Sequence, residues 1–240
     1  MRYWALGLLV FVLFSGCASR GPITSSYFPS APSAPMLEAR HDLEVSGTMS
    51  NYGGSVTAAY ALTGHFGLLA SSSLSAPSSP NLRGNQWGGE LGCGLFDSPG
   101  PHFTYSFFAA AGWGASSFGE EGLELNFFDM DSTRGDEQVH FWNAWMQGSV
   151  GYKGKIASIS FLTRITYVNM YQDIITTYNS YFYPTYWSYS ESTRYFLLIP
   201  GVQLQFGWEH VKINASLYVL SSLSESGNYP IPMIGLVYKL

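Results

Sequence analysis

From Leu43 onward, apolar residues recur at every second position in segment after segment of the chain. In one such segment Phe196, Val202 and Phe206 fall on one face, whereas Gln203 and Gln205 fall on the other. A period of two residues is typical of a β-strand that has one apolar and one wet face. The pattern therefore predicts an all-β fold built from half-wet strands.

Charge is scarce on both faces of these strands. Asp, Glu, Lys and Arg make up 11% of the chain, against about 25% in an ordinary soluble domain. A soluble sandwich turns its bulky face inward and places charges outside. A bulky aromatic face opposite a face rich in Gly, Ser and Gln is instead the pattern of a transmembrane barrel, which has an apolar exterior and a polar interior. The net charge of −5 gives no reason to expect nucleic acid as a partner.

The period predicts a transmembrane antiparallel up-and-down β-barrel of about ten strands, with eight strands as the alternative if an early hairpin is misread. After the first hairpin, short and long connections alternate, as they do between the periplasmic and outer sides of such barrels. Closure also removes the sheet edges that lipid does not tolerate. The expected strands are residues 43–50, 55–63, 65–74, 85–96, 103–118, 138–152, 156–171, 194–208, 211–222 and 231–240.

The N-terminus has the pattern of a secretory signal. A short basic start is followed by an apolar run from Trp4 to Phe14, and Ser15 and Gly16 precede Cys17. This ending resembles the lipobox of bacterial lipoproteins, from which it departs by having Phe14 where Leu is usual. The resemblance implies that residues 1–16 are a signal peptide, that Cys17 is lipidated, and that the protein is sorted to the cell outer membrane.

The residues that follow Cys17 are rich in Ser, Pro and Ala up to position 42. Proline donates no backbone hydrogen bond and interrupts both helices and sheet ladders. We therefore expect residues 17–42 to form an unstructured periplasmic tether and residues 43–240 to form the barrel. Outer-membrane lipid is the expected partner.

Several short motifs together resemble one family of membrane proteins. They are the lipobox, Ala34-Pro35-Met36-Leu37-Glu38, the segment Glu44–Ser50, Gly89-Glu90-Leu91-Gly92, Ala110-Ala111-Gly112-Trp113-Gly114 and Thr163-Arg164-Ile165-Thr166-Tyr167-Val168. The chain is similar in these motifs to the small outer membrane beta-barrel lipoproteins of diderm bacteria. The resemblance implies the barrel fold and a lipid anchor, and it implies no activity.

The phase of the strands points five charged residues toward the lumen, where a charge costs less than it does against lipid. They form the predicted lumen polar network: Glu90, Arg164, Glu44, Lys212 and Lys239. Glu90 and Arg164 fall near the middle of their strands and are expected to share contacts, whereas Glu44 and Lys239 should meet at the periplasmic rim. The network serves either to fill a narrow lumen or to line a gated pore or ligand site.

The segment 119–137 is expected to be an acidic outer loop. Asp129, Asp131 and Asp136 could offer oxygen ligands to calcium, although their spacing is not that of an EF-hand. A solvated acidic loop without a metal is the alternative.

A second outer loop is expected at residues 172–193, and it is aromatic. Clusters of Tyr and Trp suit contact with a protein or a glycan, but they also suit a girdle at the membrane boundary. The possible partner-contact residues are Tyr178, Tyr181, Phe182, Tyr183, Tyr186, Trp187 and Tyr189.

Catalysis fits the sequence poorly, and no catalytic residue or cofactor is expected. Asp131, Asp136 and His140 resemble only faintly the Asp and His pairs of outer-membrane omptin proteases. We therefore expect a non-catalytic barrel lipoprotein, either structural or an accessory subunit in an outer-membrane protein complex. The first alternative is a barrel that binds or passes a small hydrophobic or sugar ligand, and a surface protease or lipid-modifying enzyme comes last.

Overall fold

The computed structural model describes residues 27, 29–75, 82–126, 129–179, 184–208, 210–223 and 228–240. Within these ranges side chains are described except at positions 82, 83, 118, 120–126, 129–136, 176–179, 184–186 and 228. No helix in these ranges is long and apolar enough to cross a bilayer.

The described chain forms ten β-strands, which confirms the predicted number and excludes the eight-stranded alternative. The strands are β1 (Leu43–Ser50), β2 (Gly53–Ala61), β3 (Phe66–Ser75), β4 (Leu82–Asp97), β5 (Phe103–Asn126), β6 (Asp129–Lys153), β7 (Ala157–Asn179), β8 (Pro184–Gly207), β9 (Val211–Ser222) and β10 (Asn228–Lys239).

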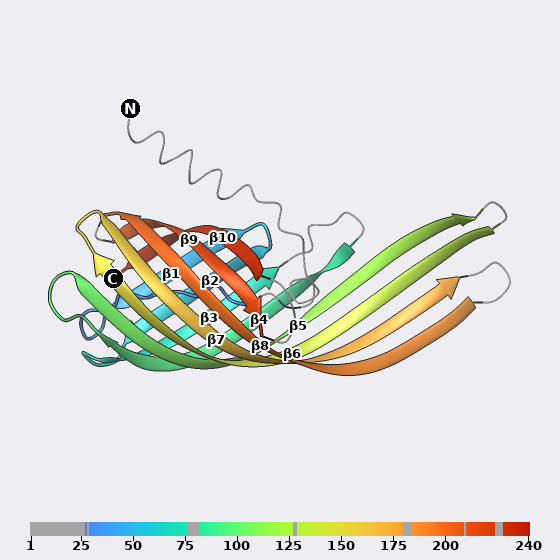
Figure 1. Cartoon of the computed structure of the whole chain (residues 1–240), viewed down its shortest axis with the longest axis horizontal. Coiled ribbons are helices and arrows are strands. Elements are labelled where there is room, and N and C mark those ends of the chain that lie inside the picture. The colour runs from blue at the N-terminus through green and yellow to red at the C-terminus, as the bar shows by residue number, and fades with distance from the viewer. Residues whose placement is uncertain are drawn as a thin grey trace, which may run out of the picture.

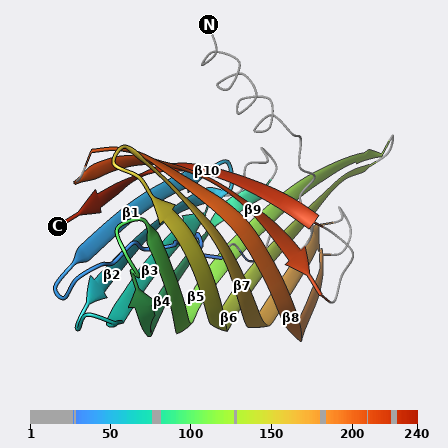
Figure 2. The same ribbon diagram turned by 60° about the vertical axis from the view of Figure 1, so that its left-hand side comes forward.

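Every strand pairs antiparallel with its neighbours in sequence, and β1 pairs with β10 to close the sheet into a barrel (Figures 1 and 2). In the closing pair Glu44 lies opposite Lys239, and Leu43 and Leu240 exchange backbone hydrogen bonds. Closure leaves neither β1 nor β10 as a free edge. The backbone N–H and C=O groups on the outer sides of these two strands therefore have hydrogen-bond partners.

The two ends of the barrel differ. One end, called the turn end here, carries the connections at residues 62–65, 98–102, 154–156 and 208–210 together with the C-terminus. At the opposite end, called the projecting end, the hairpins β5–β6 and β7–β8 extend well beyond the barrel (Figure 1). This asymmetry follows the predicted alternation of short and long connections.

The prediction of outer loops at residues 119–137 and 172–193 is corrected by the structure, because most of both segments is β-strand. β5 pairs with β6 as far as Asn126 and Asp129, and β7 pairs with β8 as far as Asn179 and Pro184. Where side chains of these extensions are described, at residues 187–192 of β8, all are exposed, so no buried face enforces a period of two in hydrophobicity there. Their backbone ladder continues nevertheless, so the hydrophobic pattern underestimates their length.

Within the barrel, side chains alternate between lumen and exterior as the period predicts. On β3 the burial alternates residue by residue, with Leu69, Ser71 and Ser73 buried and Leu68 and Leu74 exposed. The outer wall is therefore apolar, whereas the interior combines buried polar side chains with two buried hydrophobic clusters.

Candidate functional site: the filled lumen

The lumen is occupied by the protein's own N-terminal segment. In this segment, residues 27 and 29–38 form neither helix nor strand, and the described side chains from Tyr27 to Leu37 are buried. The Tyr218 hydroxyl donates to the carbonyl oxygen of Pro32 at 2.6 Å, and the Gln147 amide donates to that of Ser33 at 2.5 Å. We call residues 27–38 the lumen segment.

The expectation of an unstructured periplasmic tether is therefore wrong for residues 27–38. Pro and Ala leave few polar groups to satisfy and are narrow enough for a small barrel. Side-chain amides that point inward from the strands bind the polar backbone groups of the segment. The Ala34 N–H, for example, donates to the Gln203 side chain at 3.0 Å. The lipidation residue Cys17 and the rest of residues 17–26 lie outside the described residues.

Glu90 on β4 lies at the centre of the polar contacts in the lumen, where its side chain is buried. The hydroxyls of Ser30 and Ser71 donate to its Oε2 atom at 2.5 and 2.8 Å. The indole N–H of Trp145 donates to the same oxygen at 2.9 Å, and the Asn143 amide donates to Oε1 at 3.1 Å. A buried carboxylate needs such donors, because in their absence its desolvation is not compensated.

Arg164 on β7 is the cation that faces this carboxylate from across the lumen segment. Its Nη1 donates to the carbonyl and hydroxyl oxygens of Ser30 at 3.0 and 3.2 Å, and its Nε donates to Gln147 at 3.1 Å. Its guanidinium also lies 4.0 Å from the ring centroid of Trp145, a cation–π contact. Ser30 thus bridges Glu90 and Arg164, the two residues expected to share contacts in the middle of the barrel.

The other three predicted lumen charges lie at the turn end. Glu44, Lys212 and Lys239 line a cavity of about 600 Å³ there, together with Glu38 and Lys153. Glu44 is buried and accepts from the N–H of Met36 at 2.9 Å, and Lys239 donates to the carbonyl of Met36 at 3.0 Å. The two strands that close the barrel therefore both bind the lumen segment.

The turn that joins the lumen segment to β1 carries a cluster of ion pairs. Glu38 bonds Lys153 and Lys239, the latter at 2.6 Å, and Lys239 also lies 3.1 Å from the carboxylate of Asp42. Burial by itself raises the pKa of the Glu38 carboxyl, but the two lysines outweigh it and hold that pKa below its usual value. Glu38 is therefore charged at neutral pH and fixes the end of the lumen segment.

The sequence could not identify Ser30, Trp145 or Gln147 as part of the site. Trp145 and Gln147 have the inward phase of β6, which is a usable signal, since Met146 between them points outward. Ser30 carries no such signal, because it belongs to a Pro-rich segment without the alternation of a strand.

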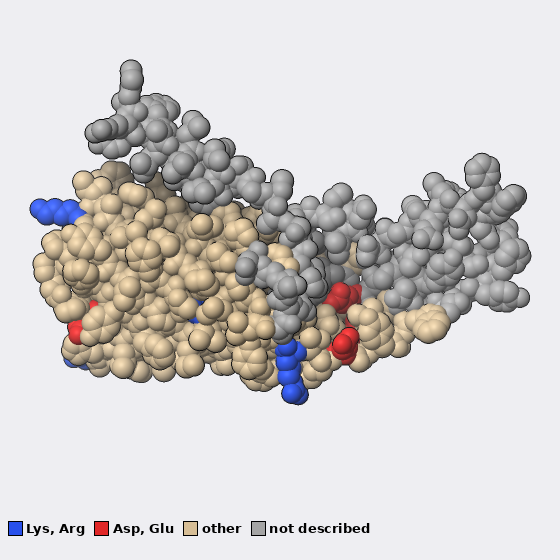
Figure 3. All heavy atoms as spheres, viewed as in Figure 1, with Lys and Arg blue, Asp and Glu red and all other residues tan. Residues whose placement is uncertain are grey.

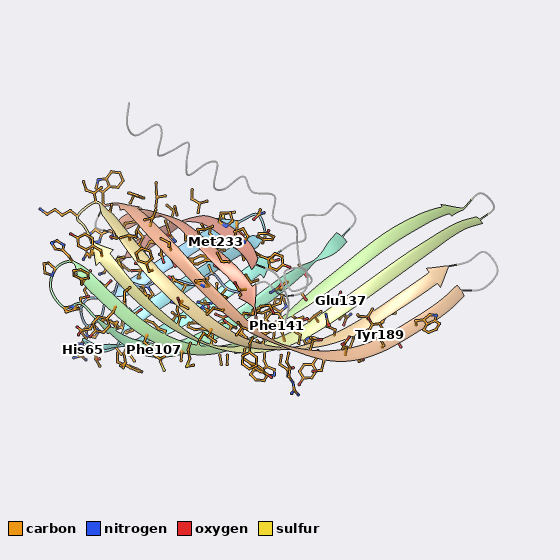
Figure 4. All side chains as sticks on the ribbon, viewed as in Figure 1. His65, Phe107, Glu137, Phe141, Tyr189 and Met233 are labelled. Atoms are coloured by element: carbon orange, nitrogen blue, oxygen red, sulfur yellow. The ribbon has the colours of Figure 1, made fainter. Side chains whose placement is uncertain are left out.

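The projecting hairpins carry the other predicted site residues. Trp187 and Tyr189 of β8 are 71% and 55% exposed, and Figure 4 shows Tyr189 on the part of β8 that lies beyond the barrel. The backbones of Tyr178 and Tyr186 are strand but their side chains are not described, and Tyr181, Phe182 and Tyr183 lie outside the described residues.

The possible calcium ligands are also on these hairpins. Asp129, Asp131 and Asp136 belong to the part of β6 whose side chains are not described, so the calcium site stays a prediction. Among the described side chains, no group of three or more His, Cys, Asp and Glu could hold a metal ion. His140 is exposed on the outer face of β6.

Comparison with known proteins gives structural neighbours and no family. No protein-family model and no curated protein matches the chain. The N-terminal β-barrel domain of Pseudomonas aeruginosa OprF aligns with 85% of this chain and 100% of that domain, at 12% identity and a TM-score of 0.33. Ail, the attachment invasion locus protein of Yersinia pestis, aligns with 84% of this chain and 99% of its own, at 12% identity and a TM-score of 0.37. Alignments at these scores do not bear on function.

Loss of Arg164 should destabilise the barrel strongly. Arg164→Met leaves the Glu90 carboxylate buried without its cation, and breaking a buried pair in this way costs about 3–5 kcal/mol. Adding Glu90→Gln should restore part of that loss. The measurement is the free energy of unfolding in urea after reconstitution into detergent micelles. Lys212→Met is the control, because Lys212 is only half-buried at the rim and should cost less. If the losses of the two single variants simply add in the double variant, the two residues are not coupled.

The turn cluster should make stability depend on acid pH. Because the folded-state pKa of Glu38 is lowered, its contribution is complete above the ordinary value of 4.5 and is lost as the pH falls through the folded-state pKa. Glu38→Gln should cost about 0.5–1 kcal/mol at pH 7, since the side chain is partly exposed, and the difference from wild type should vanish in acid. Unfolding free energies from pH 7 to pH 3 measure this. In a Lys153→Gln background the pH dependence should be smaller, and an unchanged dependence would contradict the ion-pair origin.

Proposed function

We propose that this protein is a non-catalytic outer-membrane β-barrel, anchored by a lipid on Cys17, that serves as a structural or accessory subunit with a closed lumen. The observation that carries the proposal is the outer wall of the barrel. Large apolar side chains are exposed around it: Leu91, Leu95, Phe107, Trp113, Val150, Phe161, Ile165, Phe206, Ile213, Ile234 and Leu236.

Among the described side chains, those charges that are not buried in the lumen lie on the two sides of this apolar wall. One group lies at the turn end and the other lies where the strands leave the barrel, including Glu137, Glu191 and Arg194, with few charges visible between them (Figure 3). Figure 4 places Glu137 at that second boundary and Phe107 on the wall. A charge-free belt between two charged rims is the distribution that a bilayer selects.

The height of the belt matches a membrane. On β8 the residues from Tyr195 to Gly207 contain no charge. Twelve residue steps of about 3.4 Å along a strand tilted by about 40° cover roughly 30 Å of the barrel axis. This is close to the hydrocarbon thickness of about 30 Å. Because only helices and closed barrels can satisfy their backbone groups in lipid, a closed barrel with such a belt suits the outer membrane.

The belt gives a direct test of the membrane position. In vesicles whose lipids carry bromine at mid-chain, Trp113→Phe should lower the quenchable part of the tryptophan fluorescence, because Trp113 is 57% exposed on the wall. Trp187→Phe is the matched control, since Trp187 is exposed beyond the belt and should contribute no quenchable signal. Equal changes in the two variants would contradict the membrane position.

Two observations favour different roles for the lumen. The buried lumen segment and its contacts favour a closed barrel. The alternative, a barrel that binds or passes a small hydrophobic or sugar ligand, is favoured by the rim cavity of about 600 Å³, a volume within the usual range of ligand sites. Several buried polar atoms near the segment also lack a partner among the described residues: Glu44 Oε1, Thr166 Oγ1, Gln203 Nε2, Gln205 Nε2 and Asn214 Oδ1.

Conductance separates these roles. The wild-type barrel in planar bilayers should show no steady current, because residues 27–38 fill its lumen. A variant without residues 29–35 should conduct, provided that it is still folded. Folding is checked by the change in electrophoretic mobility, called the gel shift, that a folded barrel shows between unheated and heated samples. A steady wild-type current that a sugar or an apolar solute blocks would favour the transport alternative instead.

The accessory role rests on the exposed aromatic residues of the projecting hairpins. Trp187 and Tyr189 lie beyond the belt, and both side chains are exposed. Exposed Trp and Tyr are common at the centres of protein interfaces. Replacing both with Ser should abolish co-purification of a partner from solubilised outer membrane while the gel shift of the barrel stays unchanged. Replacing the belt residues Phe161 and Ile165 with Leu is the control. A partner retained by the Ser variant would assign the aromatic residues to a membrane girdle.

A further inference from the structure

We infer that the N-terminus is threaded through the barrel, so that Cys17 and its lipid lie on the side of the projecting hairpins. The lipid would then insert into the outer leaflet, on the opposite side of the membrane from the start of β1. The inference rests on the proposed membrane barrel and on lipidation of Cys17, and it adds the side of the membrane on which the anchor lies.

The contacts along β6 give the direction of the lumen segment. Glu38 bonds Lys153, at the turn end of this strand. Ser33 accepts from Gln147, six residues farther along the strand, and the Tyr27 hydroxyl accepts from Asn143, four residues beyond that. Each step toward the N-terminus of the segment is therefore a step toward the projecting end.

The ring contact of Tyr27 with Phe141 of β6 agrees with this direction. Its ring packs edge-on against Phe141 at 4.9 Å between centroids. The same buried cluster contains Tyr52, in the β1–β2 turn, and Met233 of β10. That turn lies at the end of β1 away from its start at Leu43. Figure 4 places Phe141 between the barrel wall and the projecting hairpins.

At the turn end the chain reverses and enters β1. The N–H of Asp42 donates to the carbonyl of Ala39 at 3.2 Å, and His41 has a φ of 74°, in the left-handed region. The carboxylate of Asp42 accepts from the N–H groups of Glu38 and Ala39, which fixes this reversal. The lumen segment and β1 therefore run in opposite directions.

The length of the lumen segment is sufficient for a full crossing. Eleven residue steps in an extended, Pro-rich conformation span about 34 Å at about 3.1 Å each. The belt on the outside of the barrel is about 30 Å high. Tyr27 and Glu38 therefore lie near opposite boundaries of the membrane.

The ten residues from Cys17 to Ser26 have no route back to the turn end. The barrel is closed, so no gap between strands leads out of the lumen. The lumen itself is occupied by residues 27–38, and a return outside the wall would take unpaired backbone through lipid, which is prohibitively costly. An acyl chain on Cys17 is thus restricted to the leaflet on the side of the projecting hairpins.

Labelling on intact cells of cysteines introduced one at a time, in a protein that keeps Cys17 for lipidation, tests this topology. All variants carry Cys93→Ser, which removes a cysteine that is exposed on the barrel wall. Ser25→Cys reports the N-terminal side of the lumen segment, Trp187→Cys reports a projecting hairpin, and Lys155→Cys reports a turn at the other end. A membrane-impermeant maleimide is applied before and after the outer membrane is permeabilised.

We expect Ser25→Cys to label in intact cells to the same extent as Trp187→Cys, with Lys155→Cys labelled only after permeabilisation. If Ser25→Cys instead behaves as Lys155→Cys does, the N-terminus is not threaded and the inference is overturned. Failure of the proposed function looks different, because Lys155→Cys and Trp187→Cys would then label alike in intact cells. Mass spectrometry of the N-terminal peptide establishes lipidation of Cys17 separately, and an unmodified Cys17 overturns the lipid part of the inference.

Discussion

The requirement that every backbone polar group be hydrogen-bonded in an apolar surrounding governs this molecule. The pairing of β1 with β10 meets it for the sheet by removing both edges. A closed barrel of ten strands encloses an interior in which Ser, Gln, Asn and Thr side chains lie among buried apolar ones, and these polar groups need hydrogen-bond partners in turn. The lumen segment provides them with its carbonyl and N–H groups. The apolar exterior and the filled interior are thus two consequences of one constraint.

The lumen segment also determines how two buried charges are tolerated. Glu90 and Arg164 lie on different strands, and each would be costly to bury alone. Ser30 donates its hydroxyl to the Glu90 carboxylate and accepts from the Arg164 guanidinium with two oxygens. Trp145 donates a hydrogen bond to the Glu90 carboxylate and stacks with the Arg164 guanidinium. The network therefore couples the wall to the segment, and removing the segment would leave both charges without part of their solvation.

The strands were predictable from the sequence because a membrane enforces alternation along them, and all ten were found. The extensions of β5–β8 are not predictable in the same way, because their described side chains, at residues 187–192 of β8, are exposed and carry no alternation in burial. The order of the lumen segment is not predictable from its own sequence, because proline interrupts helices and sheet ladders. Its sequence Pro29-Ser30-Ala31-Pro32-Ser33-Ala34-Pro35 repeats every three residues, the period of a polyproline II helix. That regularity is the available signal in the sequence. The residues that contact the lumen segment come from strands distant in sequence, so they cannot be named without the fold.

The contacts at the turn end bear on how such a barrel closes. Glu44 of β1 and Lys239 of β10 lie opposite each other in the closing pair, and both bind Met36 of the lumen segment. Lys239 also holds Glu38 and Asp42, in the turn that leads from the segment to β1. Strand closure and seating of the segment therefore use the same side chains. Neither Glu44 nor Lys239 has these partners until the sheet is closed and the segment is seated, so the contacts couple the two steps.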